Sequence, residues 1–129
     1  MSNIKDTVKS FEDACQALGL DPTALPDVSK LREKDQAAQI AQYQLSIIAE
    51  ALNEGWTPDW KDSREYKYYP WFDMEDDNGS GLGLSYYDFG YDGSASRVGS
   101  RLAFKSSDLA RYAGEQFIGL YADLFLIKA

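Results

Sequence analysis

The sequence predicts an α+β fold in which helices pack against one face of an antiparallel sheet. Apolar residues recur at helical spacing over about 7–18, 32–53 and 107–125, whereas the region between the last two helices is rich in aromatic residues and glycine. The pair Asn78-Gly79, which is typical of hairpin turns, lies inside that region. With 129 residues the chain fits one domain, which we expect to span residues 1–129.

Two helices are expected before the sheet, after a loose start over residues 1–6. The first helix, about 7–18, ends before Gly19, a residue type that commonly terminates helices. Its apolar stripe consists of Val8, Phe11, Cys15 and Leu18. The second helix, about 32–53, has a broader apolar face, so we expect it to pack on the sheet or on other helices.

A three-stranded antiparallel meander is expected next, with strands at about 66–72, 82–89 and 97–105. Pro70 cannot donate a ladder hydrogen bond, so the first strand is expected to be an edge strand or to be interrupted there. Large aromatic side chains bury the most apolar area, so we expect the tryptophans to join the helices to the sheet. These residues are Trp56, Trp60 and Trp71.

The last helix, about 107–125, is expected to pack together with the second helix on one face of the sheet. Ser106 or Ser107 can cap it, because a serine side chain accepts a hydrogen bond from the first helical turn. Gly114 and Gly119 lower the helix propensity and are interpreted as positions of close packing. The expected architecture therefore has two N-terminal helices, a three-stranded meander and one C-terminal helix.

Residue composition argues against several chemistries. The chain has no histidine and one cysteine, Cys15, which excludes Ser-His-Asp and Cys-His catalytic arrangements and disfavours the usual zinc sites. The acidic stretch 73–77 begins like a calcium-binding loop, but glycine falls at position 7 and Leu84 occupies the ligand position 12. A solvated turn is therefore favoured over weak Ca²⁺ binding. We expect a non-enzymatic protein with no catalytic residue, cofactor or metal.

The chain is acidic, with a net charge of −8, which opposes broad binding of a phosphate backbone. The N-terminus lacks the pattern of a signal peptide, and no segment has the roughly 20 apolar residues that a membrane span needs. We therefore expect a cytoplasmic protein without a membrane partner. The acidity also allows a nucleic-acid mimic, although the acidic residues are scattered apart from 73–77.

A candidate partner-binding surface is formed by aromatic residues of the predicted strands and by cations beside them. It comprises Tyr68, Tyr69, Trp71, Tyr87, Phe89, Tyr91, Arg97, Arg101 and Lys105. Tyrosine, tryptophan and arginine are enriched at protein interfaces, whereas rings beside cations also hold single-stranded nucleic acid. The negative net charge favours a protein as the unknown macromolecular partner. In a further interpretation the same rings only fill the core and its rim.

Distinctive aromatic motifs occupy Glu50–Trp60 (EALNEGWTPDW), Tyr66–Phe72 (YKYYPWF) and Gly99–Ser107 (GSRLAFKSS). Together with Tyr112–Phe117 (YAGEQF), they resemble a group of small uncharacterised proteins of bacteriophages and prophages in gut bacteria. The resemblance covers most of the chain, from about residue 11 to residue 127. It implies a phage or mobile-element origin and action in the cytoplasm of a bacterial host. It implies no activity, cofactor or residue role.

Overall fold

The computed structural model describes residues 3–75 and 81–127. In chain order the elements are α1 (Ile4–Thr7), α2 (Phe11–Leu18), α3 (Glu33–Asn53), β1 (Lys67–Asp73), β2 (Ser85–Asp92), the 3-10 helix η1 (Ser100–Leu102), α4 (Ser107–Gln116) and α5 (Ile118–Phe125). The expected α+β class is confirmed. The hairpin turn expected at Asn78-Gly79 and the end of the acidic stretch 73–77 lie outside the described residues.

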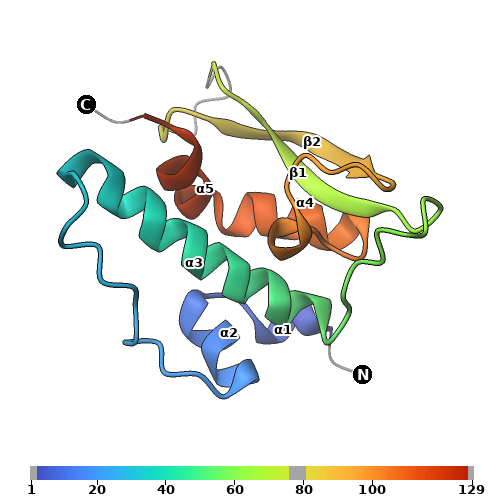
Figure 1. Cartoon of the computed structure of the whole chain (residues 1–129), viewed down its shortest axis with the longest axis horizontal. Helices are drawn as coiled ribbons and strands as arrows, with labels where there is room; N and C mark the ends of the chain where they lie inside the picture. Colours follow the sequence, from blue (N-terminus) through green and yellow to red (C-terminus); the bar gives the residue numbers. More distant parts are fainter. Residues whose placement is uncertain (1–2, 76–80, 128–129) are drawn as a thin grey trace.

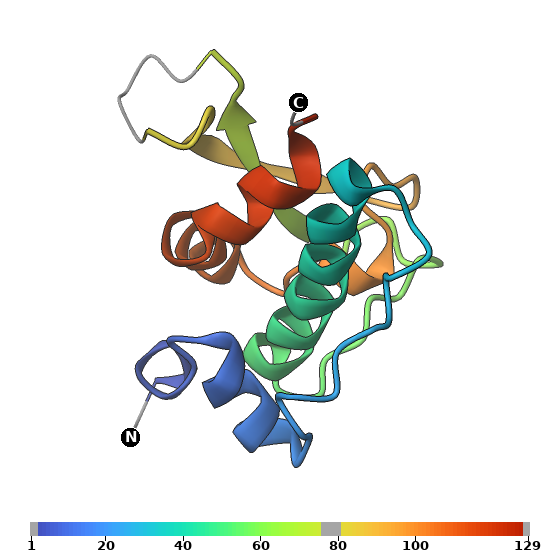
Figure 2. The ribbon, with the colours of Figure 1, turned by 90° about the vertical axis from the view of Figure 1, so that its left-hand side faces the viewer.

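The sheet forms one outer layer of the molecule (Figure 1). Helix α4 packs directly beneath both strands, α5 packs on α3, and α2 packs on the far side of α3. Figure 2, turned by 90°, shows the helices of the described residues on one side of the sheet, so the other sheet face has no helix packed on it. The sequence predicts that the second long helix also packs on the sheet, but α3 lies one layer below it.

The predicted three-stranded meander is wrong, because the sheet has two strands in the described part of the chain. Strands β1 and β2 pair antiparallel. Of the third strand expected over 97–105, only Phe104 pairs, and it bridges to Tyr68 on the free side of β1 rather than to β2. The Tyr68 N–H donates to Phe104 O at 3.0 Å, and the Phe104 N–H donates to Tyr68 O at 2.8 Å. Gly99, with φ of 75°, immediately precedes η1, which occupies the middle of the expected strand.

Asn53, at the C-terminal end of α3, provides a physical reason for the missing strand. Its side-chain amide donates to Ala103 O at 2.9 Å, and its side-chain oxygen accepts from Lys105 N at 3.0 Å. These backbone groups flank Phe104 and would otherwise be open to strand pairing. Because Asn53 is buried, the two bonds also satisfy polar atoms that have lost water. The chain is thereby anchored to α3 beside β1.

Within the described residues, which begin at Asn3, two short helices replace the predicted loose start over 1–6 and the predicted single helix over 7–18. Asn3 caps α1 by accepting a hydrogen bond from Lys5 N. Ser10 caps α2 by accepting from Asp13 N at 3.1 Å, while the Asp13 carboxylate accepts from Lys9 N at 3.0 Å. The arrangement is a variant of the capping box in which the second hydrogen bond comes from Lys9, the residue before the N-cap. A new helix therefore starts at Phe11 instead of continuing from Thr7.

The predicted single helix over 107–125 is divided at Phe117, where φ is −110° and ψ is 28°. Phe117 is buried in the core. Helix α4 before it contacts the two strands, whereas α5 after it packs on α3. The change of direction allows the two C-terminal helices to cover different surfaces. By contrast, α3 (Glu33–Asn53) lies within one residue of the helix expected over 32–53.

Gly114 determines how closely α4 approaches the sheet. A Cβ atom at this position would lie 2.7 Å from Pro70 Cβ and 2.7 Å from Tyr86 Cδ1, closer than non-bonded atoms pack. The expectation of close packing is therefore confirmed at Gly114. It is wrong at Gly119, where a Cβ would meet nothing within 4 Å.

Candidate interaction surface on the sheet

The register of the two strands places the predicted surface residues on both faces of the sheet. Residues directly opposite each other on antiparallel strands share a face. Tyr68 pairs with Tyr91 on the face that packs against the helical core, whereas Trp71 pairs with Asp88 on the outward face. The rings therefore form two separate groups rather than one surface.

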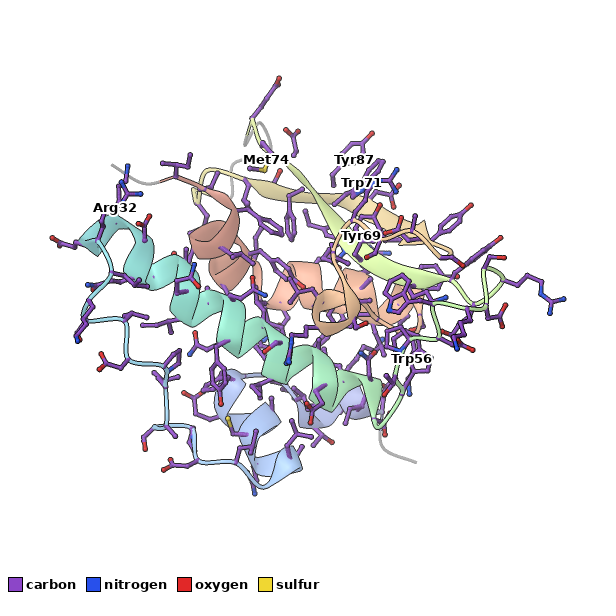
Figure 3. The ribbon with its side chains drawn as sticks, in the orientation of Figure 1. Arg32, Trp56, Tyr69, Trp71, Met74 and Tyr87 are labelled. Carbon is purple, nitrogen blue, oxygen red and sulfur yellow. The ribbon has the colours of Figure 1, made fainter. Side chains whose placement is uncertain are left out.

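The first group is the open-face pair, Trp71 and Tyr87. Trp71 pairs with Asp88 and the following residue of β1 pairs with Tyr86, so Tyr87 is the extra residue of a β-bulge. Bulges redirect side chains, and this one brings the two rings to 6.4 Å between centroids with 21° between their planes. The side chains are 47% and 64% exposed. Figure 3 shows them near Met74, on the side of the sheet away from α3.

The second group is the edge cluster, formed by Tyr66, Tyr68, Phe89 and Tyr91. Tyr66 stacks on Tyr91 with centroids 4.4 Å apart, and Tyr68 meets Phe89 edge-on at 5.8 Å. Tyr66, Phe89 and Tyr91 are exposed, whereas Tyr68 is half-buried and also packs against the core. Within this cluster Tyr68 contributes to the core, whereas the other three rings face solvent.

Tyr69 belongs to neither group, because it is buried beneath Gly90. A Cβ at Gly90 would lie 2.6 Å from Tyr69 Cζ, so glycine is needed where the ring crosses β2. The Tyr69 hydroxyl accepts a hydrogen bond from Arg97 Nη1 at 3.1 Å. Tyr69 therefore fixes the neighbouring loop and is not available to a partner.

Two hollows flank Tyr87 on the sheet. One, of about 470 Å³, is lined by Phe72, Asp73, Met74, Glu75 and Tyr87. The other, of about 410 Å³, is lined by Tyr86, Tyr87, Asp88, Phe89 and Arg111. Burial, and next the charge of Asp88, raise the pKa of Tyr86, so its hydroxyl stays neutral at physiological pH. Tyr87 is thus a ridge with acidic residues on both sides.

The cations of the predicted surface do not gather beside the exposed rings. Arg97 donates to Asp92 Oδ1 at 2.7 Å and to the Tyr69 hydroxyl. The hydrogen bond to Tyr69, followed by the charge of Asp92, raises the pKa of Arg97. Lys105 lies 3.6 Å from Glu54, just beyond the end of α3. Arg97 and Lys105 are therefore already engaged by acidic side chains.

Arg101 lies in a separate hollow of about 150 Å³ at the C-terminal end of α3. Ser46, Glu50, Asn53, Trp56, Thr57, Pro58 and Ser100 line the remainder of this hollow. Figure 3 places Trp56 below Tyr69, whereas Trp71 and Tyr87 lie above Tyr69. Arg101 is thus separated from the open-face pair.

Of the three tryptophans that were expected to join the helices to the sheet, Trp60 links the 3-10 helix η1 to β1. Its Nε1 donates to Ser100 Oγ at 2.6 Å, and its ring centroid lies 5.2 Å from Lys67 Nζ. Lys67 is 0% exposed and donates to Asp62 O at 2.8 Å, with Glu65 Oε1 at 3.7 Å. These contacts fix the segment before β1 to the sheet. Trp71 does not take part, because it faces solvent.

Sequence reasoning treated Asp73 and Glu75 as part of an acidic loop and did not include Asp73, Glu75 or Asp88 in the candidate surface. One signal was available, since aspartate is depleted in strands and Asp88 interrupts an aromatic run. Their position beside the rings depends on the bulge, which no local pattern marks. Arg111 was also missed, because it reaches the second hollow from α4.

Other chemistry receives no support from the residues that the structure describes. Within 3–75 and 81–127, no three His, Cys, Asp or Glu side chains form a group able to hold a metal ion. In the same ranges, none of the helices combines the length and apolar character of a membrane span. Cys15 is buried, and burial followed by the charge of Glu12 raises the pKa of its thiol, which disfavours the reactive thiolate.

Comparison with protein-family models, with curated proteins and with solved structures finds no match to this chain. A functional assignment therefore depends on the residues and their geometry.

Proposed function

We propose that the protein is a non-enzymatic binding module that docks a partner protein through exposed aromatic residues of the sheet, chiefly the open-face pair. The observation that carries this proposal is the location of the exposed aromatic side chains. In residues 3–75 and 81–127 they are Tyr66, Trp71, Tyr87, Phe89, Tyr91 and Phe125. All but Phe125 lie in the sheet or directly before it, whereas a surface without a partner carries such residues singly.

The chemistry of these rings supports a protein partner. Tyrosine and tryptophan dominate the energetically important positions of protein interfaces, because they bury a large area with few rotatable bonds. Single-stranded nucleic acid would instead need free cations beside the rings to meet its phosphates. Lys67 is buried, Arg97 is held by Asp92, and the cations at the end of α3 are distant. The same positions argue against the nucleic-acid alternative.

The resemblance of the aromatic motifs to bacteriophage and prophage proteins supports a phage or mobile-element origin. We accordingly propose the cytoplasm of a bacterial host as the place of action. A lysate of such a host is therefore the appropriate source of a partner.

Affinity capture from bacterial lysate, with and without nuclease treatment, tests the proposal. The wild type is compared with a Trp71→Ala/Tyr87→Ala variant and with a Leu25→Ala/Leu31→Ala control, whose leucines are also exposed but lie between α2 and α3. Loss of central aromatic residues costs about 2 kcal/mol or more at an interface, which corresponds to roughly thirtyfold weaker binding. We expect a protein captured by the wild type and by the control to be lost from the aromatic variant.

Two outcomes would contradict the proposal. An identical set of captured proteins with all three forms would refute the assignment of the surface. Capture that disappears after nuclease treatment would replace the protein partner by nucleic acid. Thermal unfolding of each form confirms that the substitutions leave the fold intact, since exposed side chains contribute little to stability.

A further inference from the structure

We propose that the open-face pair receives a cationic side chain, arginine or lysine, from the partner protein. This inference deepens the proposed function and depends on it. It rests on the charges that surround Trp71 and Tyr87, which are mostly negative. The partner segment is thus expected to be basic.

Carboxylates lie on both sides of the ring pair. Asp88 is the cross-strand neighbour of Trp71 and lines one hollow beside Tyr87, whereas Asp73 and Glu75 line the other. Asp88 Oδ1 accepts a hydrogen bond from Phe89 N at 2.8 Å, and Asp73 Oδ1 accepts one from Glu75 N at 2.9 Å. These bonds help to keep the two aspartates beside the rings. In residues 3–75 and 81–127, none of the three carboxylates forms a salt bridge.

Within the described part of the chain, Arg111 is the one cation that lines either hollow. Its Nε lies 3.1 Å from Glu115 Oε1, so its charge is already compensated within α4. The field around the ring pair is therefore dominated by Asp73, Glu75 and Asp88. A basic segment would complement this field, whereas phosphates or an acidic peptide would be repelled.

The rings themselves favour the same occupant. The face of tryptophan or tyrosine attracts a cation that lies within about 6 Å of the ring centroid, and arginine is the commonest partner. At an exposed site one such contact is worth about two- to fivefold in affinity. Nearby carboxylates add a charge-assisted component that salt screens. A surface that combines both features distinguishes arginine from its neutral isostere citrulline.

A peptide titration tests this recognition directly. The probe is acetyl-Gly-Arg-Gly-Arg-Gly-amide, and the matched control peptide carries citrulline at both arginine positions. Amide and indole signals of ¹⁵N-labelled protein are followed by NMR, with the Trp71 indole identified by its loss in Trp71→Phe. We expect the arginine peptide to shift the Trp71 indole with at least about twofold tighter binding than the citrulline peptide. Equal affinity, or shifts confined to the other indoles, would overturn the inference.

Neutral amide variants distinguish the effect of the carboxylates beside the rings from the effect of the net charge of the protein. The site variant carries Asp73→Asn, Glu75→Gln and Asp88→Asn, which retain a side-chain oxygen as acceptor. The control variant carries Asp6→Asn, Glu12→Gln and Glu33→Gln, three exposed residues on other elements. We expect at least about threefold weaker arginine-peptide binding by the site variant and unchanged binding by the control. Equal weakening in both would show that only net charge matters and would overturn the inference.

The same variants distinguish this inference from the proposed function. If lysate capture requires Trp71 and Tyr87 but is unaffected in the site variant, the binding module stands and cation recognition is refuted. If capture requires neither ring, the proposed function fails and the inference fails with it. Loss of capture in both the aromatic variant and the site variant supports both.

Discussion

Gly114 lies where α4 packs against the two strands, and substituting it tests how the sheet is held above the helices. In Gly114→Ala the new Cβ would lie 2.7 Å from Pro70 Cβ and 2.7 Å from Tyr86 Cδ1. Both neighbours belong to paired strands, so relief requires the helix or the sheet to move. The sheet carries the open-face pair, so this contact also determines how the proposed surface is presented.

The expected magnitude combines two opposing effects. Adding a methyl group to a tightly packed contact costs about 1–3 kcal/mol. Replacing glycine by alanine inside a helix stabilises it by about 0.5–1 kcal/mol. We therefore expect Gly114→Ala to lower the free energy of unfolding by about 1–2 kcal/mol, or Tm by roughly 3–8 °C for a domain of this size.

Gly119→Ala is the matched control, because Gly119 is also helical but its Cβ would meet nothing within 4 Å. Only the helix-propensity gain applies there, so we expect stabilisation by about 0.5–1 kcal/mol. Urea unfolding of both variants measures the two free energies with the same slope. Stabilisation of both by similar amounts would show that α4 does not approach the sheet as closely as described and would refute the reasoning.

Two further predictions concern buried polar groups. Lys67→Met removes the hydrogen bond to Asp62 O and leaves Glu65 without its cation, so we expect the free energy of unfolding to fall by about 1–2 kcal/mol and amide exchange to be faster in the segment before β1. The control Lys105→Met changes an exposed ion pair and should lower the free energy of unfolding by less than about 0.5 kcal/mol. Equal stability of the two variants would contradict the anchoring role of Lys67. Burial raises the pKa of Tyr121 above the ordinary value of 10.0, so above that pH the unfolded chain releases a proton that the native state retains. The stability contributed by neutral Tyr121 is therefore fully present below pH 10.0 and is lost as pH rises beyond it, and Tyr121→Phe should show a smaller fall in Tm over that range.

The long helix α3 could be predicted because a broad apolar stripe runs along it, and α2 because the same period holds from Phe11. The division between α1 and α2 could not be predicted from period alone. It depends on the cap formed by the Ser10 and Asp13 side chains, which competes locally with helix continuation. The division at Phe117 depends on tertiary packing, since α4 and α5 cover different partners.

The prediction of a third strand was wrong for a reason that lies outside residues 97–105. Residues 97–105 alternate as a strand would, but Asn53 binds the backbone on both sides of Phe104. That competition joins residues about fifty positions apart, which no local pattern reports. The aromatic residues of the candidate surface were identified from sequence, whereas their separation into two groups required the register and the bulge at Tyr87.

Photo-crosslinking tests the central claim most directly. The photoreactive residue p-benzoylphenylalanine replaces Tyr87 in one form and Leu25, an exposed residue remote from the sheet, in another. Irradiation of bacterial cells that contain each form, followed by mass spectrometry, identifies the proteins within reach. The account predicts a defined crosslinked protein at position 87 and none at position 25. Absence of a product at position 87, or the same products at both positions, would contradict it.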